Sequence, residues 1–163
     1  MKKIFLIAAI GLSVAANSQV TKVSLQASGL TCSMCSNAIY KALKSLDFVD
    51  KIDANIKTST FEISFKPNSK VDFEKLKKKV EDAGFFVARF TATMYFNNVK
   101  IKSNDVISVG DKTLQFVNVK EQNLSGAKTI RIIDKGFVSS KEYKKNSVGA
   151  AVSKNGKIYH VTI

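Results

Sequence analysis

The residue types that most often carry catalysis or bind metal are scarce in this 163-residue chain. It has one histidine, His160, two cysteines, Cys32 and Cys35, and no tryptophan. A structural zinc site needs a complete tetrahedral set of nitrogen and sulfur ligands, so a zinc finger is excluded. No serine–histidine–aspartate set, paired-carboxylate site or phosphate-binding loop can be assembled either. We therefore expect a protein that is not an enzyme.

Proline and acidic residues are scarce as well. The only proline is Pro67, whereas thioredoxin-like oxidoreductases usually place Trp-Cys-Gly-Pro-Cys and a cis-proline at their reactive sulfurs. The 13 acidic residues stand against 26 basic ones, which gives a formal net charge of +13. Because the lysines are dispersed, we expect this charge to serve solubility or attraction to an anionic membrane surface, and we expect no nucleic-acid partner.

The longest apolar run lies at the N-terminus, in MKKIFLIAAIGLSVAANSQV. Lys2 and Lys3 precede it and small residues follow it, so we predict a signal peptide over residues 1–18, cleaved before Gln19. The run is shorter than the roughly 20 residues of a spanning helix. We expect a secreted, periplasmic protein with no stable membrane insertion after cleavage. An uncleaved N-terminal anchor is the alternative.

Residues 19–90 are predicted to form one domain with the order strand, helix, strand, strand, helix, strand. Apolar residues recur with a period of two in the strands and at helical spacing in the helices. Ser69 and Asp72 resemble a helix-start capping pair, and Gly84 ends that helix. The strands are expected at residues 23–28, 49–56, 60–65 and 85–90, and the helices at residues 35–46 and 73–83. This order predicts an α+β, ferredoxin-like sandwich with both helices on one face of the sheet.

Residues 91–163 are predicted to form a second, small β-rich domain, an OB-like barrel. Turns are expected at Gly110-Asp111, Ser125-Gly126 and Asn155-Gly156, and Ser139 and Glu142 suit the start of a short helix. The expected strands cover residues 94–101, 106–109, 114–119, 129–133, 148–152 and 157–163.

Both cysteines lie in GLTCSMC, residues 29–35, between the first strand and the first helix. Cys32 precedes the helix and Cys35 lies in its first turn, so both sulfurs can converge on one point. Unpaired N–H groups and the helix dipole favour thiolates there, and thiolates suit soft ions, Cu(I) above all. The same sulfurs could accept Hg(II) or Zn(II). The residues alone leave three possibilities open: metal binding, thiol–disulfide exchange and an inert bridge.

GLTCSMC within this order of elements resembles the heavy-metal-associated domain of copper chaperones and of metal-transporting P-type ATPases. That family typically carries Gly-Met-Thr-Cys-x-x-Cys on a βαββαβ fold. The segments VDKIDANIKTSTFEISF and LKKKVEDAGFFV are also similar to the family, and Gly84-Phe85 falls where many members have Gly-Tyr. The resemblance covers about residues 20–90 and leaves residues 91–163 without an assigned role. Leu30 stands where the family has methionine, and we expect it to fill the same packing role.

The resemblance implies that Cys32 and Cys35 are the metal ligands and that Thr31 shapes the loop. It implies Cu(I) as cargo, exchanged with a metal-donor or metal-acceptor protein of the cell envelope, a transporter or chaperone. Met34 would contact that partner or add a weak thioether ligand, and His160 could join only if the second domain folds back onto the loop. Two rival hypotheses are an envelope thiol–disulfide oxidoreductase that uses the same cysteines, and an interaction module that acts through residues 91–163.

Overall fold

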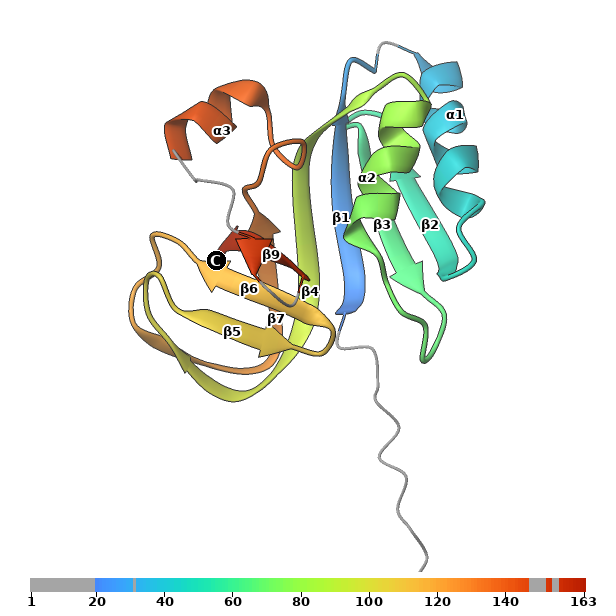
Figure 1. The fold of residues 1–163 in the computed structure, drawn as a ribbon. Helices are drawn as coiled ribbons and strands as arrows, with labels where there is room; N and C mark the ends of the chain where they lie inside the picture. The colour runs from blue at the N-terminus through green and yellow to red at the C-terminus, as the bar shows by residue number, and fades with distance from the viewer. Residues whose placement is uncertain (1–19, 31, 147–151, 154–155) are drawn as a thin grey trace, which may run out of the picture.

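A computed structural model describes residues 20–30, 32–146, 152–153 and 156–163. The predicted signal peptide, Thr31, Asn155 and most of the strand expected at 148–152 lie outside these residues. No described helix is both long and apolar enough to cross a bilayer. The elements, in chain order, are β1 (Val20–Ser28), α1 (Ser33–Lys44), β2 (Val49–Asn55), β3 (Thr60–Phe65), α2 (Phe73–Asp82), β4 (Phe86–Ile101), β5 (Val106–Val109), β6 (Lys112–Phe116), β7 (Gln122–Ile132), α3 (Ser140–Asn146), β8 (Val152–Ser153) and β9 (Gly156–Thr162) (Figure 1).

The first six elements form the predicted ferredoxin-like sandwich. Strands β1 to β4 pair antiparallel in the order β2-β3-β1-β4, and α1 and α2 cover one face (Figure 1). Alternate residues of β1 are buried against the helices because successive strand side chains point to opposite faces. The helices bury Ile39 and Leu43 of α1 and Leu76 and Val80 of α2 against that face.

The N-terminus of helix α2 is capped by one residue and not by the predicted pair. Asp72 is the N-cap, and its carboxylate accepts the N–H of Lys75 at 3.1 Å. The hydroxyl of Ser69 donates instead to the carbonyl of Lys66 at 2.7 Å, so it closes the preceding turn. Asp72 and Ser69 therefore do not act as a pair, since each satisfies a different part of the backbone.

The second half of the chain continues the sheet of the first. Strand β4 runs without interruption from Phe86 to Ile101, so it crosses the expected boundary between residues 90 and 91. It pairs with β1 on one side and with β7 on the other, and the described path continues through β9, β6 and β5. The expected OB-like barrel is therefore not confirmed. Thr91, Ala92 and Thr93 give no turn signal, and burial alternates regularly through them, so the strand has no reason to end.

The turn predicted at Ser125-Gly126 is wrong, because both residues lie within β7. Gly126 has a φ of +73°, and it lies opposite Phe96, where the register of β4 breaks before Val99. Asn98, within that break, has a φ of +51°. A β-bulge thus accommodates left-handed backbone that would otherwise end a flat strand.

The predicted start of α3 is confirmed, since the Ser139 hydroxyl accepts the N–H of Glu142 at 3.3 Å.

A cluster of buried aromatic rings joins the two halves. Phe90 of β4 lies between Phe73 of α2 and Phe137, with ring centroids 5.2 Å and 5.1 Å away, and Phe73 also meets Tyr159 of β9 at 5.4 Å. These edge-on contacts are favourable beyond the apolar area they bury. The amine of Lys77 lies over the Phe137 ring, 5.3 Å from its centroid. The halves therefore share one hydrophobic core.

Replacing Phe137 tests this shared core. Phe137 is fully buried between the two halves, so Phe137→Ala should lower the free energy of unfolding by about 3–5 kcal/mol. Urea denaturation followed by circular dichroism should still show one transition. Val106→Ala on the exposed edge strand β5 is the control and should change stability by less than about 0.5 kcal/mol. Two separate transitions in the unmodified chain would contradict a common core.

Candidate metal centre

The cysteine loop follows β1 and ends at the first turn of α1. Gly29 turns the chain out of the strand with a φ of +83°, a conformation that side chains with a Cβ disfavour. Cys32 is the N-cap of α1 with extended backbone, and its sulfur accepts the N–H of Cys35 at 3.4 Å. A cysteine sulfur thus fills the place in which a serine or aspartate oxygen usually caps a helix.

The two sulfurs lie together at the surface. Both cysteines are free, and their Sγ atoms are 2.7 Å apart. Cys32 is exposed and Cys35 is half-buried in the helix. The predicted convergence of the two thiols is therefore present in the structure. An ion or a partner's sulfur could reach this pair from solvent without displacing a structural element.

The local hydrogen bonds favour the thiolate of Cys32. The Cys35 thiol, the N–H of Cys35 and the backbone of Met34 together hold the pKa of Cys32 below its ordinary value, and the Cys35 thiol contributes most. The N-terminal end of α1 supplies partial positive charge in the same place. A larger fraction of Cys32 is therefore thiolate than in an unperturbed cysteine, as expected at a helix N-terminus.

Two apolar residues next to the cysteine loop pack against the core, and a third, between the cysteines, is exposed. Leu30 and Phe85 are partly buried and pack against the core, as expected for Leu30. Met34, between the cysteines, is 81% exposed, so it is free to meet a partner. Ser36, which no sequence motif singled out, is buried, and its hydroxyl has no hydrogen-bond partner among the described residues. Its spacing from Ile39 and Leu43 places it on the buried face of α1 and could have revealed it.

His160 does not join the cysteines. It is 4% exposed in β9, and its ring Nδ1 lies 2.7 Å from Oδ1 of Asp134. Its backbone N–H donates to Oδ2 of Asp134 at 3.1 Å. Asp134 thus links the end of β7 to β9, and the histidine is held in a structural pair. Among the described residues, no group of three or more His, Cys, Asp and Glu side chains could hold a metal ion. The two sulfurs are the candidate donors by themselves.

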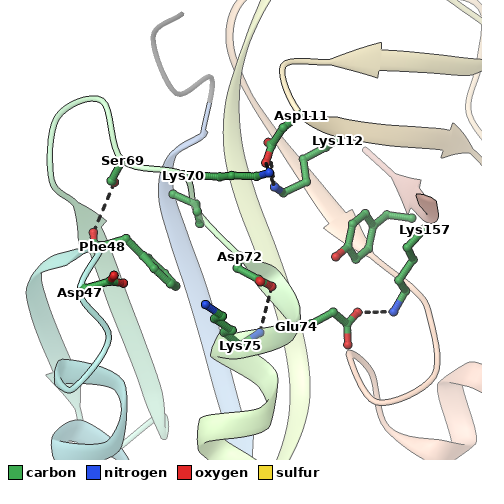
Figure 2. Close-up of a pocket in the computed structure, with 12 residues that line it drawn as sticks. Asp47, Phe48, Ser69, Lys70, Asp72, Glu74, Lys75, Asp111, Lys112 and Lys157 are labelled. Carbon is green, nitrogen blue, oxygen red and sulfur yellow. Dashed lines mark hydrogen bonds and ion pairs between the residues drawn. The ribbon is translucent and has the colours of Figure 1, made fainter. Parts of the chain in front are cut away.

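A cavity of about 770 Å³ lies away from the cysteines, between the two halves (Figure 2). Several of the charged side chains that line it pair with one another. The Lys112 amine lies 2.8 Å from both oxygens of Asp111, Glu74 pairs with Lys157, and Lys70 approaches Asp111 at 3.8 Å. Two of these three pairs, Glu74–Lys157 and Lys70–Asp111, join the two halves of the chain. The charged lining of this cavity thus connects the halves.

The electrostatics of the loop predict selective alkylation. Iodoacetamide should modify the exposed Cys32 faster than the half-buried Cys35 in the reduced protein, and the pH midpoint of the reaction at Cys32 should lie below that of an unperturbed thiol. Cys35→Ala removes the largest cause of the lowered pKa, so it should move the midpoint upward. Mass spectrometry of peptides alkylated across a pH series measures both effects. Equal rates at both thiols with no effect of Cys35→Ala would contradict this reading.

Comparisons with known proteins point to the same segment. Residues 24–86 match the heavy-metal-associated domain. The chain is 35% identical over 86 residues to the mercuric transport protein periplasmic component of Serratia marcescens, a match that covers 52% of this chain and 93% of that protein. It is 29% identical over 68 residues to the copper chaperone CopZ of Staphylococcus epidermidis, covering 42% of this chain and 98% of that protein.

A third relative is far longer than this chain. The probable copper-exporting P-type ATPase of Archaeoglobus fulgidus is 36% identical over 64 residues, which cover 39% of this chain and 8% of the ATPase. The similarity thus follows the ferredoxin-like half, in which the cysteine loop lies between β1 and α1. Through residues 24–86, the chain belongs to the heavy-metal-associated domain family.

Proposed function

We propose that the chain is exported and binds Cu(I) through Cys32 and Cys35, for transfer to a partner or sequestration in the cell envelope. One observation carries this proposal: two free sulfurs lie 2.7 Å apart at the exposed start of a helix, where the pKa of Cys32 is lowered. Thiolates are soft ligands and suit soft ions such as Cu(I). No chemical reaction is required for this role.

The low number of ligands supports a site for exchange. A closed structural zinc site would need further donors, and among the described residues no third His, Cys, Asp or Glu completes a metal-binding group with the cysteines. An open two-sulfur site leaves room for the thiolates of a partner to bind the ion before Cys32 and Cys35 release it. The partner would therefore be a metal-donor or metal-acceptor protein, a transporter or chaperone.

The names of the relatives bear on cargo and compartment. One is a copper chaperone, another a mercuric transport protein periplasmic component, so Cu(I) and Hg(II) are the leading cargoes. Zn(II) is a weaker candidate because two sulfurs leave its tetrahedral shell incomplete. The signal peptide predicted over residues 1–18 and the periplasmic relative together support a periplasmic location.

A thiol–disulfide oxidoreductase is the second candidate. The 2.7 Å separation of the sulfurs is the observation in its favour, since only a small movement would bring them to the disulfide length of about 2.05 Å. An oxidising compartment would promote that bond. Against this function, no proline lies near the cysteines in the sequence, because Pro67 is the only one in the chain.

Cu(I) titration against a strong Cu(I) chelator under anaerobic conditions tests the proposed function. The reduced protein should bind one equivalent. The double variant Cys32→Ser/Cys35→Ser should lose at least roughly a hundredfold in affinity, equivalent to about 2.7 kcal/mol. Met34→Leu keeps the apolar bulk and removes the thioether, so it is the matched control and should bind like the unmodified chain. Unchanged affinity in the double variant would refute the assignment of the ligands.

Oxidation separates the two candidate functions. A metal carrier whose sulfurs have formed a disulfide should bind no Cu(I) until a reductant restores the thiols, and it should not turn over a dithiol substrate. An oxidoreductase should show repeated turnover and a reduction potential well above that of structural disulfides. Turnover assays with dithiothreitol and redox titration in glutathione buffers measure these properties. Catalytic turnover together with weak Cu(I) binding would favour the enzyme.

A further inference from the structure

Three exposed apolar side chains lie at the end of the sheet that carries the cysteine loop. Met34 is 81% exposed in the first turn of α1, Phe86 is 71% exposed at the start of β4, and Ile56 is 56% exposed in the turn after β2. The register places these segments at one end of the sheet, since Phe86 pairs with Ser28 and β2 and β3 meet at Asn55 and Thr60. Clustered exposed apolar residues of this kind mark an interaction surface.

The C-terminal half extends this surface. Helix α3 and the turn from α2 into β4 lie at the same end of the molecule as the cysteine loop (Figure 1). Between them is a cavity of about 560 Å³, whose apolar lining comes from Phe86 and Val87 on one side and from Val138 and Tyr143 on the other. Ser28, four positions before Cys32 in the sequence, also lines it. A group bound here would therefore sit beside the metal loop.

The rim of this cavity is basic. Lys135 and Lys144 line it, and the exposed Lys141 and Lys145 lie on the same helix α3. The nearby carboxylate of Glu142 is 2.7 Å from the guanidinium of Arg131 and is thereby neutralised. Glu81 is the one acidic side chain among the residues that line the cavity. The excess positive charge would attract an acidic partner and increase its rate of association.

We propose that the C-terminal half supplies part of the docking surface for the protein that exchanges metal with Cys32 and Cys35. The partner presents an acidic segment with one protruding apolar side chain, which enters the cavity beside Phe86. This inference rests on the proposed function. A protein fits the site better than a lipid surface, because a cavity accepts a protruding side chain and because exchange requires the partner's own sulfur ligands at the loop.

Two synthetic peptides serve as probes of this surface. Each contains one Cys-x-x-Cys, and the first also carries aspartates and a leucine, whereas the second has asparagines and an alanine at those positions. Stopped-flow measurement of Cu(I) transfer from the loaded full chain should give about tenfold faster transfer to the acidic peptide at low salt. Phe86→Ser and Lys135→Glu/Lys144→Glu should each reduce that preference, because each removes one of its two causes, and high salt should reduce it as well.

Matched variants control for general effects. Tyr95→Ser removes another exposed aromatic residue of β4, and Lys102→Glu/Lys120→Glu makes the same charge change beyond the opposite end of that strand. Both should keep the preference for the acidic peptide. Chelator competition on every variant should give unchanged equilibrium Cu(I) affinity, which separates docking from metal binding.

Several results would overturn the inference. One is equal transfer to both peptides; another is loss of the preference in the control variants as well. Vesicles of phosphatidylglycerol that bind the chain through Phe86, while the peptides show no preference, would identify a lipid surface instead. If the chain binds no Cu(I), the proposed function fails by itself. Fluorescence anisotropy with metal-free labelled peptides then still measures the docking preference and supports or refutes the surface.

Discussion

Strand β4 is the element on which the rest of the structure depends. It forms antiparallel ladders with β1 on one side and β7 on the other, so the cysteine-bearing half and the C-terminal half share its backbone hydrogen bonds. It begins opposite Ser28, beside the metal loop, and its buried Phe90 lies within the aromatic cluster that joins the halves. Because both halves pair with β4, the C-terminal half cannot move away from the cysteine loop without breaking many backbone hydrogen bonds.

The second constraint is the start of α1. With Cys32 as its N-cap, the helix uses a sulfur to satisfy its own N–H groups, and the same contacts lower the pKa of that sulfur. The N-terminus of α1 and the metal site that we propose thus use the same sulfur atom. The arrangement also creates a vulnerability, since neighbouring sulfurs in an oxidising compartment tend to form a disulfide. If the chain is exported, as we propose, either a bound ion or a reductant is needed to keep these thiols available.

Local patterns in the sequence predicted the elements of the ferredoxin-like half and the position of the cysteine pair. They predicted these features because each depends on residues close together along the chain. The errors lie where distant residues decide the outcome. Gly126 was predicted to lie in a turn because the bulge opposite it on β4 is not visible in the local sequence. His160 was considered as a possible ligand because its contact with Asp134 joins residues far apart in the chain. The cavity beside the loop also depends on distant contacts, since its walls join Phe86 to Val138.

X-ray absorption at the copper edge of the Cu(I)-loaded, full-length protein tests the central claim most directly. We expect a first coordination shell of sulfur with a low coordination number. The spectrum should be unchanged in His160→Gln, because that histidine is buried against Asp134. A nitrogen scatterer that disappears in His160→Gln would contradict this expectation. So would a sulfur shell that persists in Cys32→Ser/Cys35→Ser.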